Sequence, residues 1–470
     1  MSRRTSGRTA RRLDSVRRQL AAEPSLPFSR LLDADLVTAA LRESGVAFRD
    51  RLYPPWVTVW IFLSQVLDPM QCCRQAVLRF AAWRSANGQS ACSTNTGAYC
   101  QARQRLPEAV AGQLARRVGN QLHRREAPRS WRWKGRPVKI ADGTTVTMPD
   151  TAENQAAYPQ PKAQRPGCGF PLARLVVVFS LSVGTVLEMV IGQYKGKQTG
   201  EVSLLRALHD SLEPGDILLG DRLYGGYFDI ALPRDRGVDV VTRLHQQRRA
   251  DFRRGRRLGR GDHVVEWDKP PRPGWMDKET HRRLPPRLTV RETRVSVTIP
   301  GFRSEAFVVV STLLDAAHTA GDLADLYRAR WQAELDLRSL KQTLQMDVLR
   351  GRTPEMVRLE IQVHLLAYNL VRQVMADAAE KHGVLPRQIS FTATLQALLA
   401  FMPYLAMMTP EQAGACYSRM LDAIAQHRVG NRPDRVEPRK RKRRPKPYDS
   451  LNVPRQTARE QCRKKKKPKP

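Results

Sequence analysis

Short runs of β-branched and aliphatic residues alternate with helical segments between residues 138 and 313, and this alternation constrains the fold more than any other feature of the chain. Strands separated by helices indicate an α/β protein in which helices cover a central sheet. Val183 and Gly184, between two of the runs, predict a hairpin turn. The expected strands are residues 138–142, 174–181, 185–191, 216–221, 238–243, 288–299 and 306–313.

Two of the expected strands end in an aspartate, Asp142 and Asp221. In an α/β sheet the ends of the strands present active-site residues, so these two carboxylates are predicted to belong to one site. A single aspartate after a strand is also a common turn former or helix cap. Asp150 is therefore an alternative to Asp142, and Asp216 and Asp229 are alternatives to Asp221.

A third carboxylate, Glu334, lies in a segment with a helical pattern. Tyr327, Arg330, Glu334 and Lys341 follow one another at offsets of 3, 4 and 7 residues, which places them on one face of a helix. One carboxylate among two cations and a phenol suits the binding of a metal ion together with a phosphodiester. The alternative is an ordinary surface ion pair of Glu334 with Arg330 or Arg338.

The carboxylates Asp142, Asp221 and Glu334 come from separate elements, as in a site that holds two metal ions. Oxygen ligands favour hard cations, so the expected cofactors are two Mg²⁺ or Mn²⁺ ions. Such a pair of ions activates the attacking oxygen and stabilises the leaving oxygen of an in-line displacement at phosphorus.

The charge of the chain predicts a polyanionic partner. The sequence holds 80 Lys and Arg residues against 45 Asp and Glu residues, a formal net charge of +35, and nucleic acid is the commonest partner of such a protein. A membrane surface is the rival partner, but the apolar run at residues 56–67 is too short to span a bilayer. No apolar signal segment follows Met1, so we expect no membrane association and a cytoplasmic location.

Two segments are predicted to contact DNA. Residues 246–260 contain seven arginines, which favour tracking of phosphates. A short helix after residues 93–97 carries polar residues that suit a DNA groove. Solvated surface charge is the alternative interpretation of both segments. The candidates are Gln101, Arg103, Arg105, Arg253 and Arg254.

The pattern Tyr327-x-x-Arg330-x-x-x-Glu334, with Lys341 seven residues further on, resembles the YREK signature of bacterial insertion-sequence transposases of the IS-four family. Trp331 also matches that family. The stretches 140–144 and 219–224, around Asp142 and Asp221, resemble its first and second Asp motifs. In the best-known branch the second Asp is followed by Arg-Glu-Ala-Asp, whereas this chain has Arg-Leu-Tyr.

The resemblance implies a ribonuclease-H-like catalytic core with a DDE triad of Asp142, Asp221 and Glu334. It also implies that a β-rich insertion interrupts the core. The helical pattern before the core predicts an all-helical N-terminal domain, and the basic, proline-rich composition after it predicts a disordered tail. The expected parts are a basic flexible N-terminus at 1–25, a helical DNA-binding domain at 26–134, the core at 135–245 and 305–420, the insertion at 246–304 and the tail at 421–470.

The resemblance further implies a DNA transposase that binds the inverted ends of its insertion sequence, cleaves them and joins the 3′-OH to target DNA, acting as a homodimer at the bacterial nucleoid. Tyr327, Arg330 and Lys341 would bind phosphates. A hairpin-forming step would need an aromatic residue to stack a flipped base, with core packing as the alternative role. The candidates for stacking are Trp267, Trp275 and Trp331. A domesticated DDE nuclease and a catalytically inactive DNA-binding relative are the alternative functions.

Overall fold

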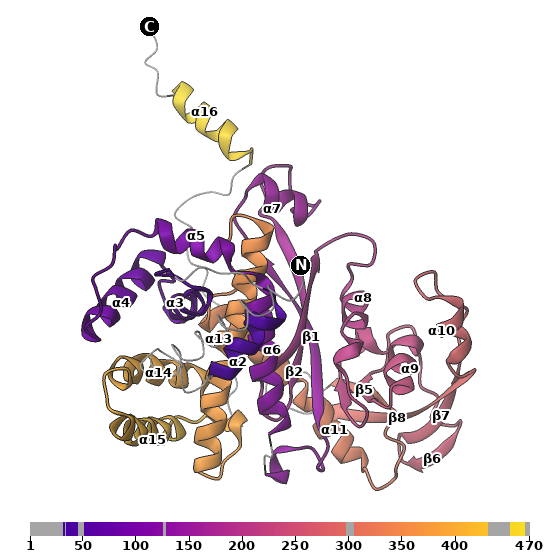
Figure 1. Ribbon diagram of the computed structural model, residues 1–470. Helices are drawn as coiled ribbons and strands as arrows, with labels where there is room; N and C mark the ends of the chain where they lie inside the picture. The colour runs from indigo at the N-terminus through magenta and orange to yellow at the C-terminus, as the bar shows by residue number, and fades with distance from the viewer. Residues whose placement is uncertain are drawn as a thin grey trace, which may run out of the picture.

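A nine-stranded mixed sheet forms the centre of the described part of the chain (Figure 1). The computed structural model describes residue 32 and residues 34–45, 51–125, 128–297, 305–430 and 452–465. The order across the sheet is β3-β2-β1-β4-β5-β9-β8-β7-β6. The strands are β1 (Val138–Thr147), β2 (Leu172–Ser180), β3 (Val186–Gln193), β4 (Ile217–Leu219), β5 (Asp239–Arg243), β6 (Arg256–Gly259), β7 (Asp262–Asp268), β8 (Arg287–Val297) and β9 (Glu305–Ser311).

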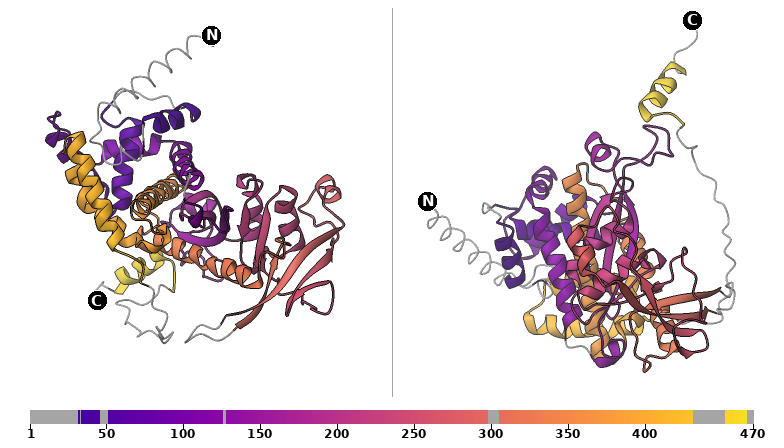
Figure 2. Two further views of the ribbon diagram at one scale, coloured as in Figure 1. Left: turned by 90° about the horizontal axis from the view of Figure 1, so that it is seen from below. Right: turned by 90° about the vertical axis from the view of Figure 1, so that its right-hand side faces the viewer.

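The pairing divides the sheet into a mixed half and an antiparallel half. Strands β3, β2 and β1 form an antiparallel meander, and β4 and β5 then add in parallel to β1. Strand β9 pairs antiparallel with β5, and β8, β7 and β6 continue antiparallel from it. Figure 2 shows these last strands extending away from the helical part of the molecule. The predicted α/β class is confirmed.

Both faces of the mixed half are apolar, as the alternation of side chains along a strand requires. Ile140 and Val177 belong to one buried cluster, and their neighbours Ala141 and Val178 belong to the other. The first cluster joins the sheet to α6 (Glu108–Arg124) and α13 (Pro354–Lys381), and the second joins it to α8 (Glu201–Arg206) and α9 (Tyr227–Asp235). Figure 1 shows these helices on opposite sides of β1 and β2.

The segment expected to form a helical N-terminal domain contains a bundle of helices before β1. Helix α3 is apolar around most of its circumference, and it packs against α13. None of the helices among the described residues is long and apolar enough to cross a membrane. Besides α6, the helices of this segment are α2 (Ala34–Glu43), α3 (Pro55–Leu67), α4 (Cys73–Ala86) and α5 (Gly97–Arg105).

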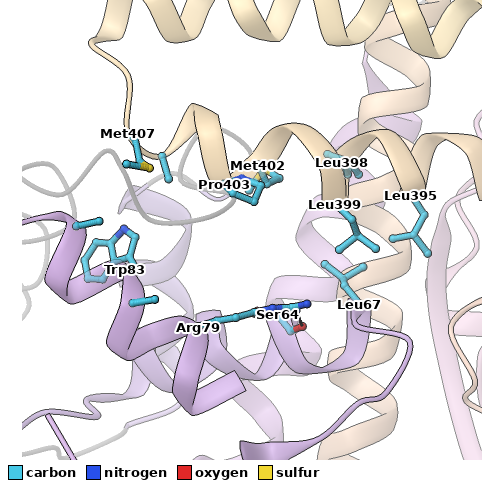
Figure 3. Close-up of a pocket in the computed structure, with 13 residues that line it drawn as sticks. Ser64, Leu67, Arg79, Trp83, Leu395, Leu398, Leu399, Met402, Pro403 and Met407 are labelled. Atoms are coloured by element: carbon cyan, nitrogen blue, oxygen red, sulfur yellow. Dashed lines mark hydrogen bonds between the residues drawn. The ribbon is translucent and has the colours of Figure 1, made fainter. Parts of the chain in front are cut away.

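An apolar groove separates the N-terminal bundle from α14 (Phe391–Leu405). Its volume is about 420 Å³, and Figure 3 shows Trp83 on one wall facing Met402 and Met407 on the other. Arg79 at its edge forms an ion pair with Asp68. The groove lies apart from the predicted carboxylates, none of which lines it.

The chain after the core keeps more regular structure than the sequence predicts. Helix α15 (Pro410–Gln426) passes the expected start of the disordered tail at residue 421, and α16 (Arg455–Lys465) lies within the tail. The prediction of disorder is therefore wrong for these segments. Ala, Gln, Glu, Arg and Lys are good helix formers, which accounts for α16 despite its charge. The predicted flexible N-terminus 1–25 and residues 431–451 and 466–470 lie outside the described residues.

Candidate active site

Asp142 and Asp221 approach each other where β1 and β4 separate. The two strands pair in parallel, and the last pair is Ile140 with Leu219. Each aspartate comes two residues after its member of that pair, so the register brings both to the same end of β4. The charge of Asp221 accordingly acts on the Asp142 carboxyl group.

Asp142 does not end its strand, contrary to the prediction. Strand β1 continues to Thr147, and Asp142 pairs with Val177 of β2. The β-branched residues Thr144 and Thr145 favour an extended backbone, and β2 provides a partner after β4 has ended. The Asp142 side chain is 17% exposed, so its carboxylate stands on a half-buried strand surface rather than in a turn.

The alternative aspartates are engaged elsewhere. Asp216 is buried before β4 and forms an ion pair with Lys139 at 2.7 Å. Asp229 on α9 pairs with Arg206 at 2.7 Å, and Asp150 accepts a hydrogen bond from Gln155. Asp221 instead caps the short helix η3 (Arg222–Tyr224), where its Oδ1 atom accepts a hydrogen bond from the backbone N–H of Leu223 at 2.7 Å.

Arg330 joins the third carboxylate to the first. Its Nη2 atom lies 3.0 Å from Glu334 Oε1, and its Nη1 atom lies 3.9 Å from Asp142 Oδ2. Glu334 is therefore brought to the same region of the molecule as Asp142, with one guanidinium between the two carboxylates. The i,i+4 ion pair that was the alternative reading of Glu334 is present, and it forms part of this larger arrangement.

The helical face that carries Glu334 is built from three consecutive pieces rather than one helix. Helix α11 (Ala320–Ala329) ends before Arg330, α12 (Trp331–Arg338) follows, and a π-helical turn, η4 (Ser339–Thr343), contains Lys341. Arg330 keeps helical torsion angles (φ −51°, ψ −33°), so the path stays helical through the junction. The π-helical turn shifts Lys341 from the regular helical register that the sequence predicts, and such turns are frequent at functional sites.

Tyr327 is held on the same side of the sheet as the carboxylates. Its ring packs on Phe307 of β9 at a centroid distance of 5.3 Å, and the charges of Arg330 and Asp221 both act on its phenol. Strand β9 therefore covers the helical segment at Tyr327.

Burial dominates the electrostatics of Asp142. Burial and, to a smaller extent, the nearby carboxylates of Glu201 and Asp221 together raise the pKa of this carboxyl group to about 6. The N–H of Gly143 and the guanidinium of Arg330 act in the opposite direction, because both stabilise the carboxylate. The site thus concentrates negative charge, which the guanidinium of Arg330 partly offsets.

Sequence reasoning missed Glu201. This residue begins α8, and its Oε1 atom accepts a hydrogen bond of 2.8 Å from the hydroxyl of Tyr224. Burial and the Glu201 carboxylate raise the pKa of Tyr224 well above its ordinary value, so the hydroxyl stays protonated. The sequence contains only an indirect indication of this pair, namely a glycine beside each aspartate. Gly143 leaves space for Glu201, and Gly220 leaves space for Tyr224.

Asp336 anchors the helix that bears Glu334. It is fully buried two residues further along α12, and two arginines converge on it. Arg372 comes from α13, and Arg387 comes from η5 (Pro386–Gln388). Arg387 also donates hydrogen bonds of 2.8 Å to the carbonyl oxygens of Ser180 and Leu181. The network therefore fixes α12 against α13 and the end of β2.

The chemical type of the candidate ligands at this site suits a hard divalent cation. Asp142, Asp221 and Glu334 offer carboxylate oxygens, which Mg²⁺ and Mn²⁺ prefer. Within the described residues, no three acidic, His or Cys side chains are gathered closely enough to share one ion, and Arg330 stands between two of the three carboxylates.

The three tryptophans predicted to stack on a base differ in accessibility. Trp267 is 6% exposed, its Nε1–H donates to Glu292, and Arg248 covers its ring at 4.0 Å. It is a packed core residue, so its prediction as a stacking residue is wrong. Trp275 is 38% exposed, but the guanidinium of Arg206 lies over its ring. Trp331, next to Arg330, is 55% exposed.

Arg103 is also misplaced by the sequence prediction. Tyr99, Ala102 and Arg103 fall at i, i+3 and i+4 and form the buried face of α5. The Arg103 guanidinium lies 3.9 Å from the ring centroid of Phe62 and donates to Gln65, so it packs inside the bundle and is not available to DNA. The neighbouring candidates Gln101 and Arg105 are exposed.

The arginine-rich segment after β5 borders an open groove of about 720 Å³ against β7 and β8. Arg254 lines it, and the guanidinium of Arg253 projects into solvent beside it, with both residues paired to Asp251. A concave surface rimmed by arginines suits a phosphate backbone better than a flat surface would. The lining also includes Arg248, Arg249 and Arg256.

Comparison with known proteins defines the family of the chain. The sequence profile of a family described as "Transposase DDE domain" matches residues 133–370, which include Asp142, Asp221 and Glu334. The chain therefore belongs to the DDE transposases, and its resemblance to the IS-four family is confirmed.

Several proteins are similar to the chain. "Transposase InsG for insertion sequence element IS4" of Escherichia coli (strain K12) is 28% identical over 451 residues, which cover 93% of this chain and 95% of that protein. "Putative transposase InsL for insertion sequence element IS186A" from the same organism is 35% identical over 73 residues, 16% of this chain and 20% of that protein.

One solved structure shows a weaker likeness. The cryo-EM structure of a piggyBac transposase synaptic complex with hairpin DNA covers 86% of this chain and 85% of its own, at 9% identity and a TM-score of 0.42.

Proposed function

We propose that this protein is a DNA transposase that binds the inverted ends of its insertion sequence, cleaves them and joins the freed 3′-OH to target DNA. One observation carries the proposal. Asp142 and Asp221 stand two residues beyond the last pair of a parallel ladder, and Arg330 connects Glu334 to Asp142. The family match adds that these residues lie within a transposase DDE domain.

The division of the chain follows from this function. We assign residues 135–245 and 305–420 to a ribonuclease-H-like core, whose support is the mixed sheet β3-β2-β1-β4-β5 with helices on both faces. Residues 246–304 form the insertion, and residues 26–134 form a DNA-binding domain. Gln101 and Arg105 are exposed on α5 and can contact DNA there.

Asp142, Asp221 and Glu334 would hold the two divalent ions, Mg²⁺ or Mn²⁺. When bound, such ions lower the pKa of an attacking water and offset charge on the leaving oxygen. The guanidinium of Arg330 has two carboxylate partners, and its planar fork suits phosphate equally well. Arg330 would therefore bind a DNA phosphate beside the carboxylates that hold the ions.

The remaining groups of the site act on DNA. Tyr327 and Lys341 contribute a phenolic hydroxyl and a point charge for phosphates near the cleaved bond. In the first step the oxygen of water attacks phosphorus, and the 3′ oxygen leaves with a proton. In the second step that 3′-OH attacks a phosphorus of target DNA, and a 3′ oxygen of the target leaves. Both steps exchange one P–O bond for another.

The partners of the reaction are double-stranded DNA ends and target DNA. Cutting two ends in one complex requires two active sites, so we propose a homodimer on DNA. The arginine-lined groove beside β7 would track phosphates of the same DNA, with Arg254 in its lining and Arg253 exposed beside it. Trp331 is the most exposed of the three tryptophans and the best placed to stack on a displaced base, since it adjoins Arg330.

Replacing Glu334 with alanine tests this function. The wild type is expected to cleave and join DNA that carries the inverted repeats flanking its element, in Mg²⁺ or Mn²⁺ but not in EDTA. Glu334→Ala should lose both reactions by at least about 10³-fold, equivalent to about 4 kcal/mol of activation free energy, while gel-shift binding persists. Glu355→Ala, at an exposed glutamate of α13, is the matched control and should act as the wild type.

Each alternative function has its own outcome. Cleavage without joining of a pre-cut 3′-OH end would indicate a nuclease. DNA binding without cleavage in either metal would indicate an inactive relative and contradict the proposal. Equal activity of Glu334→Ala and the wild type would show that Glu334 is not a catalytic residue.

A further inference from the structure

We propose that Glu201 and Tyr224 form a positioning pair that sets the separation between Asp142 and Asp221. The inference rests on the proposed function, because it takes the two aspartates as metal ligands. The pair is joined by the hydrogen bond of 2.8 Å from the Tyr224 hydroxyl to Glu201 Oε1. Each member of the pair also packs on the glycine that adjoins one aspartate.

Glu201 contacts the backbone directly after Asp142. A Cβ atom added to Gly143 would lie 2.3 Å from the carboxyl carbon of Glu201, a distance that real atoms do not reach. The carboxyl group of Glu201 therefore occupies the space that a side chain at position 143 would need. Because α8 begins at Glu201, the start of this helix is placed against the middle of β1.

Tyr224 contacts the backbone directly before Asp221. A Cβ atom added to Gly220 would lie 2.5 Å from Cδ2 of the Tyr224 ring. The Tyr224 N–H also donates to the carbonyl oxygen of Asp221 at 3.2 Å, and the ring is buried in the apolar cluster beneath α9. These contacts fix the ring over the turn that presents Asp221.

The hydrogen bond between Tyr224 and Glu201 therefore links the segments that carry Asp142 and Asp221 beyond the end of the β1–β4 pairing. Backbone pairing between β1 and β4 covers only three residue pairs and stops at Ile140 and Leu219. Beyond it, the chain of contacts runs from Gly143 through Glu201 and Tyr224 to Gly220. A carboxylate separation held in this way suits a site in which two ions must be bridged at a set distance.

The test compares metal binding by full-length variants, with isothermal titration of Mn²⁺ as the readout and Mn²⁺-dependent cleavage as a second one. Tyr224→Phe removes only the hydroxyl, Glu201→Ala removes the acceptor, and Glu201→Gln keeps an acceptor oxygen without the charge. Tyr227→Phe is the matched control, because that buried tyrosine donates to the Pro285 carbonyl at 2.6 Å, away from the aspartates. Thermal unfolding of each variant is followed in parallel.

Tyr224→Phe and Glu201→Ala are expected to weaken Mn²⁺ binding by about 10-fold or more, the range seen when an outer group that orients a metal ligand is lost. The double variant should be no weaker than either single one, because both changes break the same bond. Glu201→Gln should retain most of the affinity, and Tyr227→Phe should match the wild type.

Three results would overturn the inference. Wild-type affinity in Tyr224→Phe would show that the hydrogen bond does not position the ligands. Glu201→Gln as weak as Glu201→Ala would assign the effect to charge rather than to position. An equal loss in Tyr227→Phe would assign it to general destabilisation. If the wild type itself neither binds Mn²⁺ nor cleaves DNA, the proposed function fails, and the inference falls with it.

Discussion

Replacing Asp142 with asparagine is expected to stabilise the fold while it abolishes DNA cleavage. Burial raises the pKa of Asp142 to about 6, from 3.8 for an ordinary aspartate. At pH 7 the folded protein thus ionises a carboxyl group whose surroundings disfavour the charged form, at a cost of at most about 3 kcal/mol relative to an exposed aspartate. Asparagine is neutral and nearly isosteric, so it relieves this cost. The loss of a metal ligand should lower cleavage by at least about 10³-fold.

The stability gain should depend on pH in a defined direction. Because the pKa is higher in the folded than in the unfolded protein, the folded state binds more protons between about pH 4 and pH 6. The wild type therefore recovers the lost stability as the pH falls through 6, and the advantage of Asp142→Asn should shrink from about pH 8 to about pH 5. Melting temperatures in EDTA across this range measure the effect.

A control separates this effect from charge removal in general. Asp150→Asn changes an exposed aspartate that accepts a hydrogen bond from Gln155, and it should leave the melting temperature nearly unchanged. An Asp142→Asn protein that melts below the wild type at pH 7 would contradict the prediction. So would a difference that is the same at pH 5 and pH 8.

Replacing Asp336 with alanine is expected to cause the largest loss of stability among the charged residues discussed. The change leaves the guanidinium groups of Arg372 and Arg387 without the carboxylate on which both converge, in a fully buried place. Removing one partner of a buried ion pair costs about 3–5 kcal/mol, because the remaining charge is not solvated. Urea denaturation should show a lower midpoint with an unchanged slope.

The matched control is Asp325→Ala on α11, whose ion pair with Arg328 is exposed. An exposed pair contributes about 0–1 kcal/mol, so this variant should denature nearly as the wild type does. A loss below about 1 kcal/mol in Asp336→Ala would contradict the account of α12 as a helix anchored by this network. At temperatures where the variant remains folded, Asp336→Asn should retain more activity than Asp336→Ala, because the amide oxygen still accepts a hydrogen bond.

The sequence predicts those features of the site that depend on local pattern. Strand periodicity located the runs that bear Asp142 and Asp221, and helical spacing grouped Tyr327, Arg330 and Glu334, because both signals come from residues close in the chain. Arg330 does lie between two carboxylates. The α/β class followed from the alternation of strands and helices, and the family followed from the motifs around these residues.

The sequence-based predictions are wrong where contacts between residues distant in the chain determine the structure. Strand β1 passes Asp142 because β2, thirty residues away, offers a partner there. Arg103 points inward because Phe62 and Gln65 on α3 receive it, although arginine at a helix surface usually meets water. Trp267 is covered by Arg248, and Glu201 reaches Gly143 from another element. None of these partners is a neighbour in sequence.

The junction of β5 with β9 has a consequence for how the protein unfolds. The chain leaves the core after Arg243, forms β6, β7 and β8, and returns as β9, which hydrogen-bonds to both β5 and β8. One continuous ladder of backbone hydrogen bonds thus crosses the border between the proposed core and insertion. The strands that flank Asp221 and those that carry the arginine-lined groove should therefore lose their amide-exchange protection together, as one cooperative unit, rather than in two separate transitions.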